Sequence, residues 1–590
     1  MPENARLHSG HNLERFRGAS HAVWVSSAFT NALENGPTAV ESLFRCLLYS
    51  LALFFHLLGD PPTLSLFLTA TDYGQRHQHH ASAIGTTIVS GLEPSMNSAG
   101  DVYRQLGVEP LINCAGVRTN FGGSSPLPAV RRAMEAAADA FVDLDELADA
   151  IAARIQELTG AEWGVITAGS AAALALAAAA CIAGNDPEHI LSLPEFEPRP
   201  LILMPGTHRF AYDQSLRMSG AIIAEFHSLS ELRAQVQSGA AMICVLGRRS
   251  VSEFGGLEGI AAEAAMTKIP ILVDCAGMGP SSPDVWLQRG ASMVVYSAGK
   301  YLRGPQSTAF LVGSKALTKA AWQIGAPHQA WGRPIKVGKE EMIGAIVALE
   351  QWFSDPDACQ EQQRWLRALD FIAFPIARLP GVRTTVIPAD EFNVVPRLRI
   401  DIDEDKYHVE PSKFRSDLLA ERPRVLLNDF WVRPDHIIVD PFNIEEGEAE
   451  LAATKIVAAL RGCLGRPRQY AGTSPVCDFG GSWSTTISFA HRDEESILRL
   501  SGDDAGIIEG THHTQRGIGV VNGIAIGNTL SLHAAHQHDS MRVLYSFEGS
   551  LVNDEISGTV VLGASSEEHR GMVFDSQFGT SLWKGKRSDE

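Results

Sequence analysis

The chain lacks the features of a disulfide-stabilised, metal-binding or nucleic-acid-binding protein. Its eight cysteines, spread over 590 residues, form no C-x-x-C pair and no metal-ligand spacing, so buried free thiols in a reducing compartment are expected. Basic residues are outnumbered, with 49 Lys and Arg against 68 Asp and Glu. The resulting formal charge of −19 disfavours nucleic acid as a partner, since such binding needs clustered cations.

A long uninterrupted apolar run is also missing. The most apolar stretch, Leu43 to Leu58, is interrupted by Arg45 and His56, and it is shorter than the roughly 20 residues of a spanning helix. It also lies too far from the first residue for an ordinary signal peptide. We predict a cytoplasmic protein with no membrane partner, and a poorly ordered extension over residues 1–95 or a true translation start at Met96. A membrane anchor is the less favoured alternative.

The remaining sequence predicts several folded domains. With 45% hydrophobic and 20% charged residues the chain can form two or three cores. Strands near 163–167, 201–204, 221–225, 241–246, 270–274 and 292–296 alternate with helices, which predicts an α/β large domain with a mainly parallel sheet over residues 96–337. A small α+β domain is expected at 338–463, a linker at 464–479, and an antiparallel β-barrel-like domain at 480–590, where short alternating segments are separated by glycines.

Three short motifs occur in order within the predicted large domain. Gly169, Ser170 and Ala171 stand between a strand and an Ala-rich helix, Asp274 ends a buried strand, and Lys300 lies in Val294–Gln306 between an apolar run and a Gly/Pro-rich turn. Alone, each motif is compatible with an ordinary cap, strand end or solvated lysine. The S-x-x-K spacing of Ser297 and Lys300 also occurs in serine hydrolases, where the serine would be the nucleophile.

Together the motifs match what pyridoxal 5'-phosphate (PLP) requires. The free N–H groups at Gly169, Ser170 and Ala171 would bind the phosphate, Asp274 would keep the pyridine nitrogen protonated, and Lys300 would form the Schiff base. Ser297 could add a hydroxyl to the phosphate. We therefore predict PLP as the cofactor and Lys300 as the catalytic residue.

Residues from about 100 to 465 resemble the selenocysteine synthase family, the L-seryl-tRNA selenium transferases, which have the aspartate-aminotransferase fold (PLP fold type I). The matching segments are Leu111–Gly116, Arg118–Ser124, Asp143–Asp145, Leu158–Glu162, the Asp274 strand and Ser297–Gln306. The resemblance implies Lys300 as the PLP lysine, Asp274 as the pyridine partner, and a homo-oligomer in which neighbouring subunits complete each site.

The chain departs from this family in ways that make a tRNA partner doubtful. Gly299 stands where the family commonly has Asp before the lysine, and Arg303 replaces the first glycine of L-x-G-G-P-Q. Residues 1–95 do not look like a basic helical bundle. The expected reaction is removal of the Cα proton followed by β-elimination or replacement. One alternative is an ammonia lyase acting on an amino-sugar acid such as D-glucosaminate 6-phosphate, and a second is a non-catalytic PLP-fold binding protein.

The remaining candidates are cationic side chains. Arg303, and after it Arg118 and Arg333, are candidates for binding a substrate carboxylate or phosphate, because the guanidinium fork matches such oxyanions. His208 lies where the fold usually places a ring over the cofactor, although a structural histidine is favoured. The histidines of the C-terminal domain (His512, His513, His533, His536 and His538) have no accompanying carboxylate or cysteine pattern, so no metal site is predicted.

Overall fold

The computed structural model describes residues 100–354, 358–390, 393–465, 478–566 and 577–588. The predictions for residues 1–95 and for most of the linker at 464–479 fall outside the described residues. Among the helices that are described, none is long and apolar enough to cross a bilayer.

The larger sheet has seven strands in the order β2-β8-β7-β6-β5-β3-β4. All six predicted strands are present. The adjacent pairs β7–β6, β6–β5, β5–β3 and β3–β4 are parallel. The sequence interpretation missed β8, which runs antiparallel between β2 and β7. The strands are β2 (Trp163–Thr167), β3 (Leu201–Pro205), β4 (Ile222–Phe226), β5 (Met242–Leu246), β6 (Ile271–Asp274), β7 (Met293–Ser297) and β8 (Ala309–Gly313). Their nearly continuous apolar sequences suit strands that are covered on both faces.

Helix α7 (Ser170–Ala183) is the central helix of this part and packs against β7 and β8. Nine of its residues are buried, which explains why alanine and leucine occupy all sides of the helix. The other helices up to residue 354 are α4 (Asp101–Gln105), α5 (Pro128–Ala138), α6 (Leu144–Thr159), α8 (Pro187–Ser192), α9 (Asp213–Arg217), α10 (Leu229–Gln237), α11 (Gly247–Ser250), α12 (Gly256–Ala264), α13 (Val285–Gln288), α14 (Lys315–Ile324) and α15 (Lys339–Ser354), with 3-10 turns η2 (Thr119–Phe121) and η3 (Gly206–His208).

A second group of elements has its own apolar core. Its antiparallel sheet has the order β12-β10-β9, and a separate parallel pair joins β1 (Leu111–Cys114) to β11 (Arg424–Leu427). A segment from the predicted large domain thus pairs with one from the predicted small domain, and the exact domain boundaries stay a prediction. The other elements are β9 (Val382–Ile387), β10 (Arg397–Ile402), β12 (His436–Val439), α16 (Ala358–Ile376), α17 (Pro411–Ala420), α18 (Glu448–Cys463) and η4 (Asp429–Trp431).

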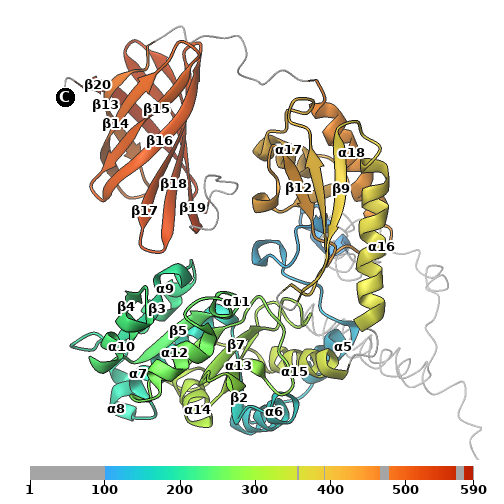
Figure 1. Ribbon diagram of the computed structural model, residues 1–590, viewed down its shortest axis with the longest axis vertical. Helices are drawn as coiled ribbons and strands as arrows, with labels where there is room; N and C mark the ends of the chain where they lie inside the picture. Colours follow the sequence, from blue (N-terminus) through green and yellow to red (C-terminus); the bar gives the residue numbers. More distant parts are fainter. Residues whose placement is uncertain (1–99, 355–357, 391–392, 466–477, 567–576, 589–590) are drawn as a thin grey trace, which may run out of the picture. The chain divides into compact units, whose positions relative to one another are not determined.

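The C-terminal strands form a closed antiparallel barrel in sequence order (Figure 1), which confirms and sharpens the barrel-like prediction. Closure comes from pairing the first strand with the last, Ser482 opposite Ser588. The strands are β13 (Gly481–Ser488), β14 (Asp493–Gly502), β15 (Ile507–Thr514), β16 (Gly517–Ile526), β17 (Thr529–His538), β18 (Met541–Val552), β19 (Glu555–Ser566) and β20 (Thr580–Ser588). A closed barrel leaves no open edge on which another strand could pair.

The barrel interior holds a buried histidine that predicts acid sensitivity. Burial lowers the pKa of His512 from 6.5 to about 3. Between these two values the unfolded chain binds more protons than the folded barrel, so stability falls as pH falls through this window. The loss is expected to reach about 1.4 kcal/mol per pH unit. Hydrogen exchange of barrel peptides, corrected for intrinsic rates, should show weaker protection at about pH 5 than at about pH 7.5. Equal protection would contradict this expectation.

Candidate active site

The pairing of the seven-stranded sheet brings the three predicted motifs to one edge. Thr167 of β2 lies opposite Ala309 of β8, which in turn lies opposite Ser297 of β7. On the other side of β7, Val295 pairs with Asp274, the last residue of β6. Gly169 lies two residues after Thr167, and Lys300 lies three residues after Ser297. The α7 start, Asp274 and Lys300 therefore meet at the same sheet edge. Ligands bind at this edge in open α/β sheets.

Asp274 and Lys300 are both partly buried, and their charges act on each other. Burial raises the pKa of the Asp274 carboxyl and lowers the pKa of the Lys300 amine. Each group opposes the shift of the other, because the ammonium favours the carboxylate and the carboxylate favours the ammonium. The N–H of Ala276 also donates to Asp274 Oδ1 at 2.9 Å, which stabilises the carboxylate. A lysine with a lowered pKa supplies more neutral amine, the form that acts as nucleophile and base.

The start of α7 has the geometry of an anion site. Gly169 is the N-cap with φ of 89°, a backbone conformation that side chains rarely adopt. The first N–H groups of a helix have no partner within it, and those of Ser170 and Ala171 are among them. The Ser170 hydroxyl is buried and has no hydrogen-bond partner within the described residues. A buried polar atom without a partner is costly, so this hydroxyl and the helix start together fit a phosphate group.

The turn before Lys300 explains the glycine at position 299. A Cβ on Gly299 would lie 2.4 Å from the Cα of Gln306 and 2.6 Å from its carbonyl oxygen. The Gly299 carbonyl also accepts from the Ser124 hydroxyl at 3.0 Å. The backbone of this turn therefore folds back on itself with no space for an aspartate at position 299.

Gly299→Ala is expected to lower the free energy of unfolding by on the order of 2 kcal/mol, because the new methyl group overlaps backbone atoms that cannot rotate away. Urea denaturation measures the loss. Gly277→Ala is the matched control, since a Cβ there would meet no atom within 4 Å and the φ is ordinary. The control should change the stability by less than about 0.5 kcal/mol. Equal effects of the two substitutions would contradict the close approach at Gly299.

The three arginines predicted to bind substrate lie in different settings. Arg303 has a positive φ of 54°, a conformation that glycine adopts more readily, and the family pattern has glycine at this position. Its guanidinium donates to Glu361 Oε1 at 2.9 Å and to the Ser125 carbonyl at 3.0 Å. Arg118 pairs with Asp429 and donates to Asn428 Oδ1 at 3.2 Å. Arg333 is exposed. Arg303 and Arg118 thus hold chain segments together, and their role toward a substrate stays a prediction.

His208 is fully buried, and its Nε2 atom makes no hydrogen bond within the described residues. The Leu246 N–H donates to Nδ1 at 3.1 Å, so the neutral ring carries its proton on Nε2, which lies 3.5 Å from Glu253 Oε2. Burial lowers the pKa of His208 to about 4, which favours that neutral form. These contacts fit the structural histidine that the sequence interpretation favoured.

Comparison with known proteins places the chain among enzymes. No family model matches it. It is 28% identical over 354 residues to the 5'-C-glycyluridine monooxygenase-decarboxylase of a Streptomyces species, a match that covers 58% of this chain and 87% of the relative. The D-glucosaminate-6-phosphate ammonia lyase of Salmonella typhimurium is 27% identical over 376 residues, a match that covers 61% of this chain and 97% of the relative. The L-seryl-tRNA(Sec) selenium transferase of Methylocella silvestris is 27% identical over 326 residues, a match that covers 50% of this chain and 65% of the relative.

A solved structure of D-glucosaminate-6-phosphate ammonia-lyase has the same fold, with a TM-score of 0.54 and 24% identity over 62% of this chain and 100% of that one. The chain has the fold of the PLP-dependent enzymes of fold type I, and its homologues are enzymes. Its homologues include both a selenium transferase and an ammonia lyase, so the resemblance, the fold class, the PLP cofactor and the enzyme prediction are confirmed. Which reaction this PLP enzyme catalyses is a narrower question.

The structure adds three residues that the sequence interpretation missed. Tyr301 follows Lys300, and burial raises its pKa while the charges of Arg397 and Arg248 lower it. Arg397 and Arg248 therefore both lie near Tyr301. Arg397 donates to Asp440 Oδ2 at 3.0 Å and lies over the Trp431 ring at 4.4 Å, whereas Arg248 is exposed in α11, just past β5. A search of residues just beyond each predicted strand would have found Arg248. Arg397 needed the three-dimensional fold.

Proposed function

We propose that this PLP-dependent enzyme acts at the Cα of a small β-hydroxy-α-amino acid and eliminates the β-hydroxyl group. The observation that supports the proposal is the partly buried pair of Asp274 and Lys300 beside the α7 start. Gly169, Ser170 and Ala171 would hold the phosphate of PLP, with Ser297 nearby at the end of β7. Asp274 would hold the proton on the pyridine nitrogen. Bound PLP supplies a sink for the electron pair that remains when the Cα–H bond breaks.

The residues of the chain have separate tasks in this reaction. The Lys300 amine would hold the cofactor and, when the substrate amine replaces it, would receive the Cα proton on Nζ. The bond from the β-carbon to its hydroxyl would then break, and the hydroxyl would leave as water with the proton that Lys300 had received. Return of the Lys300 amine to the cofactor would release the product as an enamine. The released enamine hydrolyses to a 2-oxo acid and ammonia. The exposed Arg248 and Arg333 are candidates for binding a carboxylate or phosphate of the substrate, because their guanidinium groups face solvent.

The names of two relatives support the choice of substrate. Glucosaminate and the seryl group each carry an amine on the carbon next to the carboxyl carbon and a hydroxyl on the following carbon. The match to the ammonia lyase spans 97% of that relative, against 65% for the selenium transferase. The formal charge of −19 also favours a small substrate over tRNA. A homo-oligomer, expected from the family resemblance, is part of the same proposal.

Product analysis tests this proposal. Full-length chain saturated with PLP is incubated with D-glucosaminate, D-glucosaminate 6-phosphate, L-serine or seryl-tRNA, and ammonia and 2-oxo acid are measured. We expect equal amounts of both products from at least one of the small amino acids and none with Lys300→Ala. Conversion of seryl-tRNA alone, and only with a selenium donor, would overturn the proposal in favour of the transferase. No conversion of any of the four compounds would also count against it.

Ser170→Ala separates the phosphate role from a structural one. The substitution is expected to weaken PLP binding by about tenfold, because it removes a hydrogen bond to a charged group. It should leave the PLP-free chain as stable as before or more stable by up to about 1 kcal/mol, since the hydroxyl has no partner to lose. Equilibrium dialysis with PLP and urea denaturation measure the two effects. Unchanged PLP affinity, or a large loss of stability, would contradict the assignment.

A further inference from the structure

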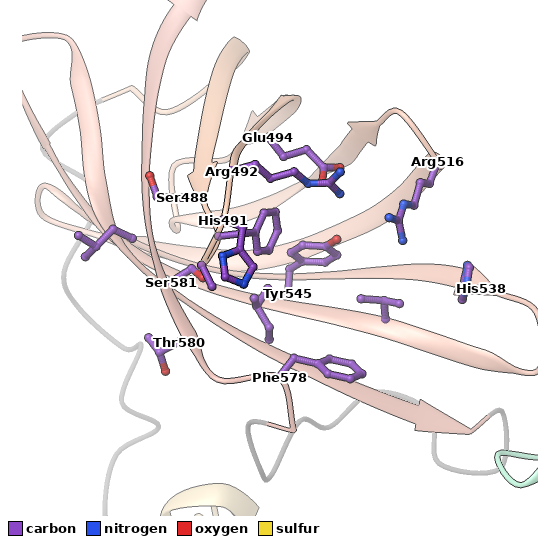
Figure 2. A pocket seen from close by; sticks show the side chains of 15 residues that line it. Ser488, His491, Arg492, Glu494, Arg516, His538, Tyr545, Phe578, Thr580 and Ser581 are labelled. Carbon is purple, nitrogen blue, oxygen red and sulfur yellow. The ribbon is translucent and has the colours of Figure 1, made fainter. Parts of the chain in front are cut away.

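The barrel contains a cavity to which the PLP reaction assigns no role. In an up-and-down barrel, every second turn lies at the same end. The β13–β14, β15–β16 and β17–β18 turns therefore lie together at one end of this barrel. A cavity of about 830 Å³ opens among them, as Figure 2 shows. This volume lies within the range of small-molecule sites, and an eight-stranded barrel is wide enough to hold one small ligand.

The inner wall of the cavity is mostly apolar. Side chains alternate along each strand, so Val543 and Tyr545 of β18 face the same side as the buried Phe547. Phe489, just after β13, and Leu562 of β19 also line the cavity. Phe578 stands at the mouth, and 55% of its surface is exposed (Figure 2). Large apolar side chains at an opening mark a site for an apolar group.

The floor of the cavity is closed and uncharged. The Tyr545 ring stacks on Phe547 at 6.0 Å and meets the His512 and His536 rings edge-on at 5.1 and 5.4 Å. Below it, His512 is hydrogen-bonded to Ser496 and to His536, both at 3.0 Å. Burial lowers the pKa of both histidines, so they stay neutral. A ligand is therefore confined to the outer half of the barrel, and these histidines cannot neutralise an anion.

Positive charge is concentrated at the mouth. Arg492 and Arg516 stand on two of the turns, and the one carboxylate of the lining, Glu494, already pairs with Arg492 at 3.3 Å. In the part of the chain that the structure describes, no carboxylate pairs with the Arg516 guanidinium. Tyr545, Glu494 and Arg516 line the same cavity (Figure 2). Burial and the charge of Glu494 raise the pKa of the Tyr545 hydroxyl, and the charge of Arg516 lowers it. Arg516 and Tyr545 thus offer donors next to an apolar wall.

We propose that the mouth of the barrel binds a small organic acid with an apolar body, such as an aryl or alkyl carboxylic acid. The carboxylate is held by Arg516 and the Tyr545 hydroxyl, and the body lies against Phe489, Val543 and Leu562. A charge-assisted hydrogen bond next to an apolar wall gives both affinity and orientation. The site is separate from the PLP chemistry and does not depend on it.

Calorimetric titration of the full-length chain, saturated with PLP, tests the site with hydrocinnamate and dodecanoate as probes. We expect saturable binding of at least one probe. Arg516→Gln should weaken it about tenfold or more, and Tyr545→Phe should weaken it less. Arg499→Gln is the matched control, because this exposed arginine lies on β14 and does not line the cavity. Hydrocinnamyl alcohol, which has no charge, should bind at least about tenfold more weakly than hydrocinnamate.

Three results would overturn the proposal. They are the absence of saturable binding of both acids, binding that Arg516→Gln leaves unchanged, and equal affinity for the acid and the alcohol. Because PLP is present throughout and the variants lie in the barrel, none of these results bears on the elimination reaction. Conversely, a chain that fails to turn over any amino acid could still bind the probes.

Discussion

Lys300→Ala is expected to lower turnover by on the order of a thousandfold or more and to abolish the visible absorbance of bound PLP. The substitution removes both the amine that holds the cofactor and the base that receives the Cα proton, and loss of a positioned base alone costs about 10²- to 10⁴-fold. Absorbance spectra and ammonia release measure the two effects. The stability of the PLP-free chain should not fall, because burial disfavours the charged amine that is removed.

Lys319→Ala provides the control for the lysine substitution. Lys319 is 41% exposed and pairs with Asp149 at the surface, so its loss removes a positive charge without touching the sheet edge. This variant should keep the full visible absorbance of bound PLP and the full turnover. A Lys300→Ala chain that remains coloured and active would show that another amine serves the cofactor.

Asp274→Asn is expected to lower turnover by about 10²- to 10⁴-fold while the fold is retained. The asparagine oxygen can still accept the Ala276 N–H that Asp274 accepts at 2.9 Å, so the loop after β6 keeps its hydrogen bond. What is lost is the negative charge that holds the proton on the pyridine nitrogen. Steady-state kinetics with the best small amino acid measure the loss.

An exposed carboxylate serves as the reference for Asp274. Asp139→Asn, at the end of α5, neutralises a charge at the surface and should leave kcat unchanged. If Asp274→Asn were as active as Asp139→Asn, the cofactor ring would not depend on a negative charge at the end of β6. Hydrogen exchange of the peptide containing Ala276 would confirm that the loop is intact in both variants.

Local patterns were enough to predict much of the fold and the central residues of the site. Apolar runs marked the strands that end at Thr167, Asp274 and Ser297, and the residues just beyond such ends are where an α/β sheet binds ligands. Alternation and glycine-rich turns marked the barrel. The shape of its mouth could not be predicted, because the cavity depends on which side chains of eight strands meet at one end.

Contacts between distant segments limited the prediction elsewhere. Strand β1 pairs with β11 across about 300 residues of sequence, and a four-residue apolar run does not reveal such a partner. Arg118 and Arg303 appeared free to bind substrate, but their guanidinium groups contact Asp429 and Glu361, each far away in sequence. Strand β8 follows the Gly/Pro-rich turn after Lys300, and its five apolar residues were assigned to no strand.

Reductive trapping tests the central claim most directly. The full-length chain is incubated with PLP, reduced with borohydride, digested and mapped by mass spectrometry, which locates the lysine that carried the cofactor. The partly buried pair of Asp274 and Lys300 predicts one pyridoxyl phosphate group per chain, attached to Lys300. A label found only on exposed lysines such as Lys319 and Lys268, with Lys300 unmodified, would contradict the account.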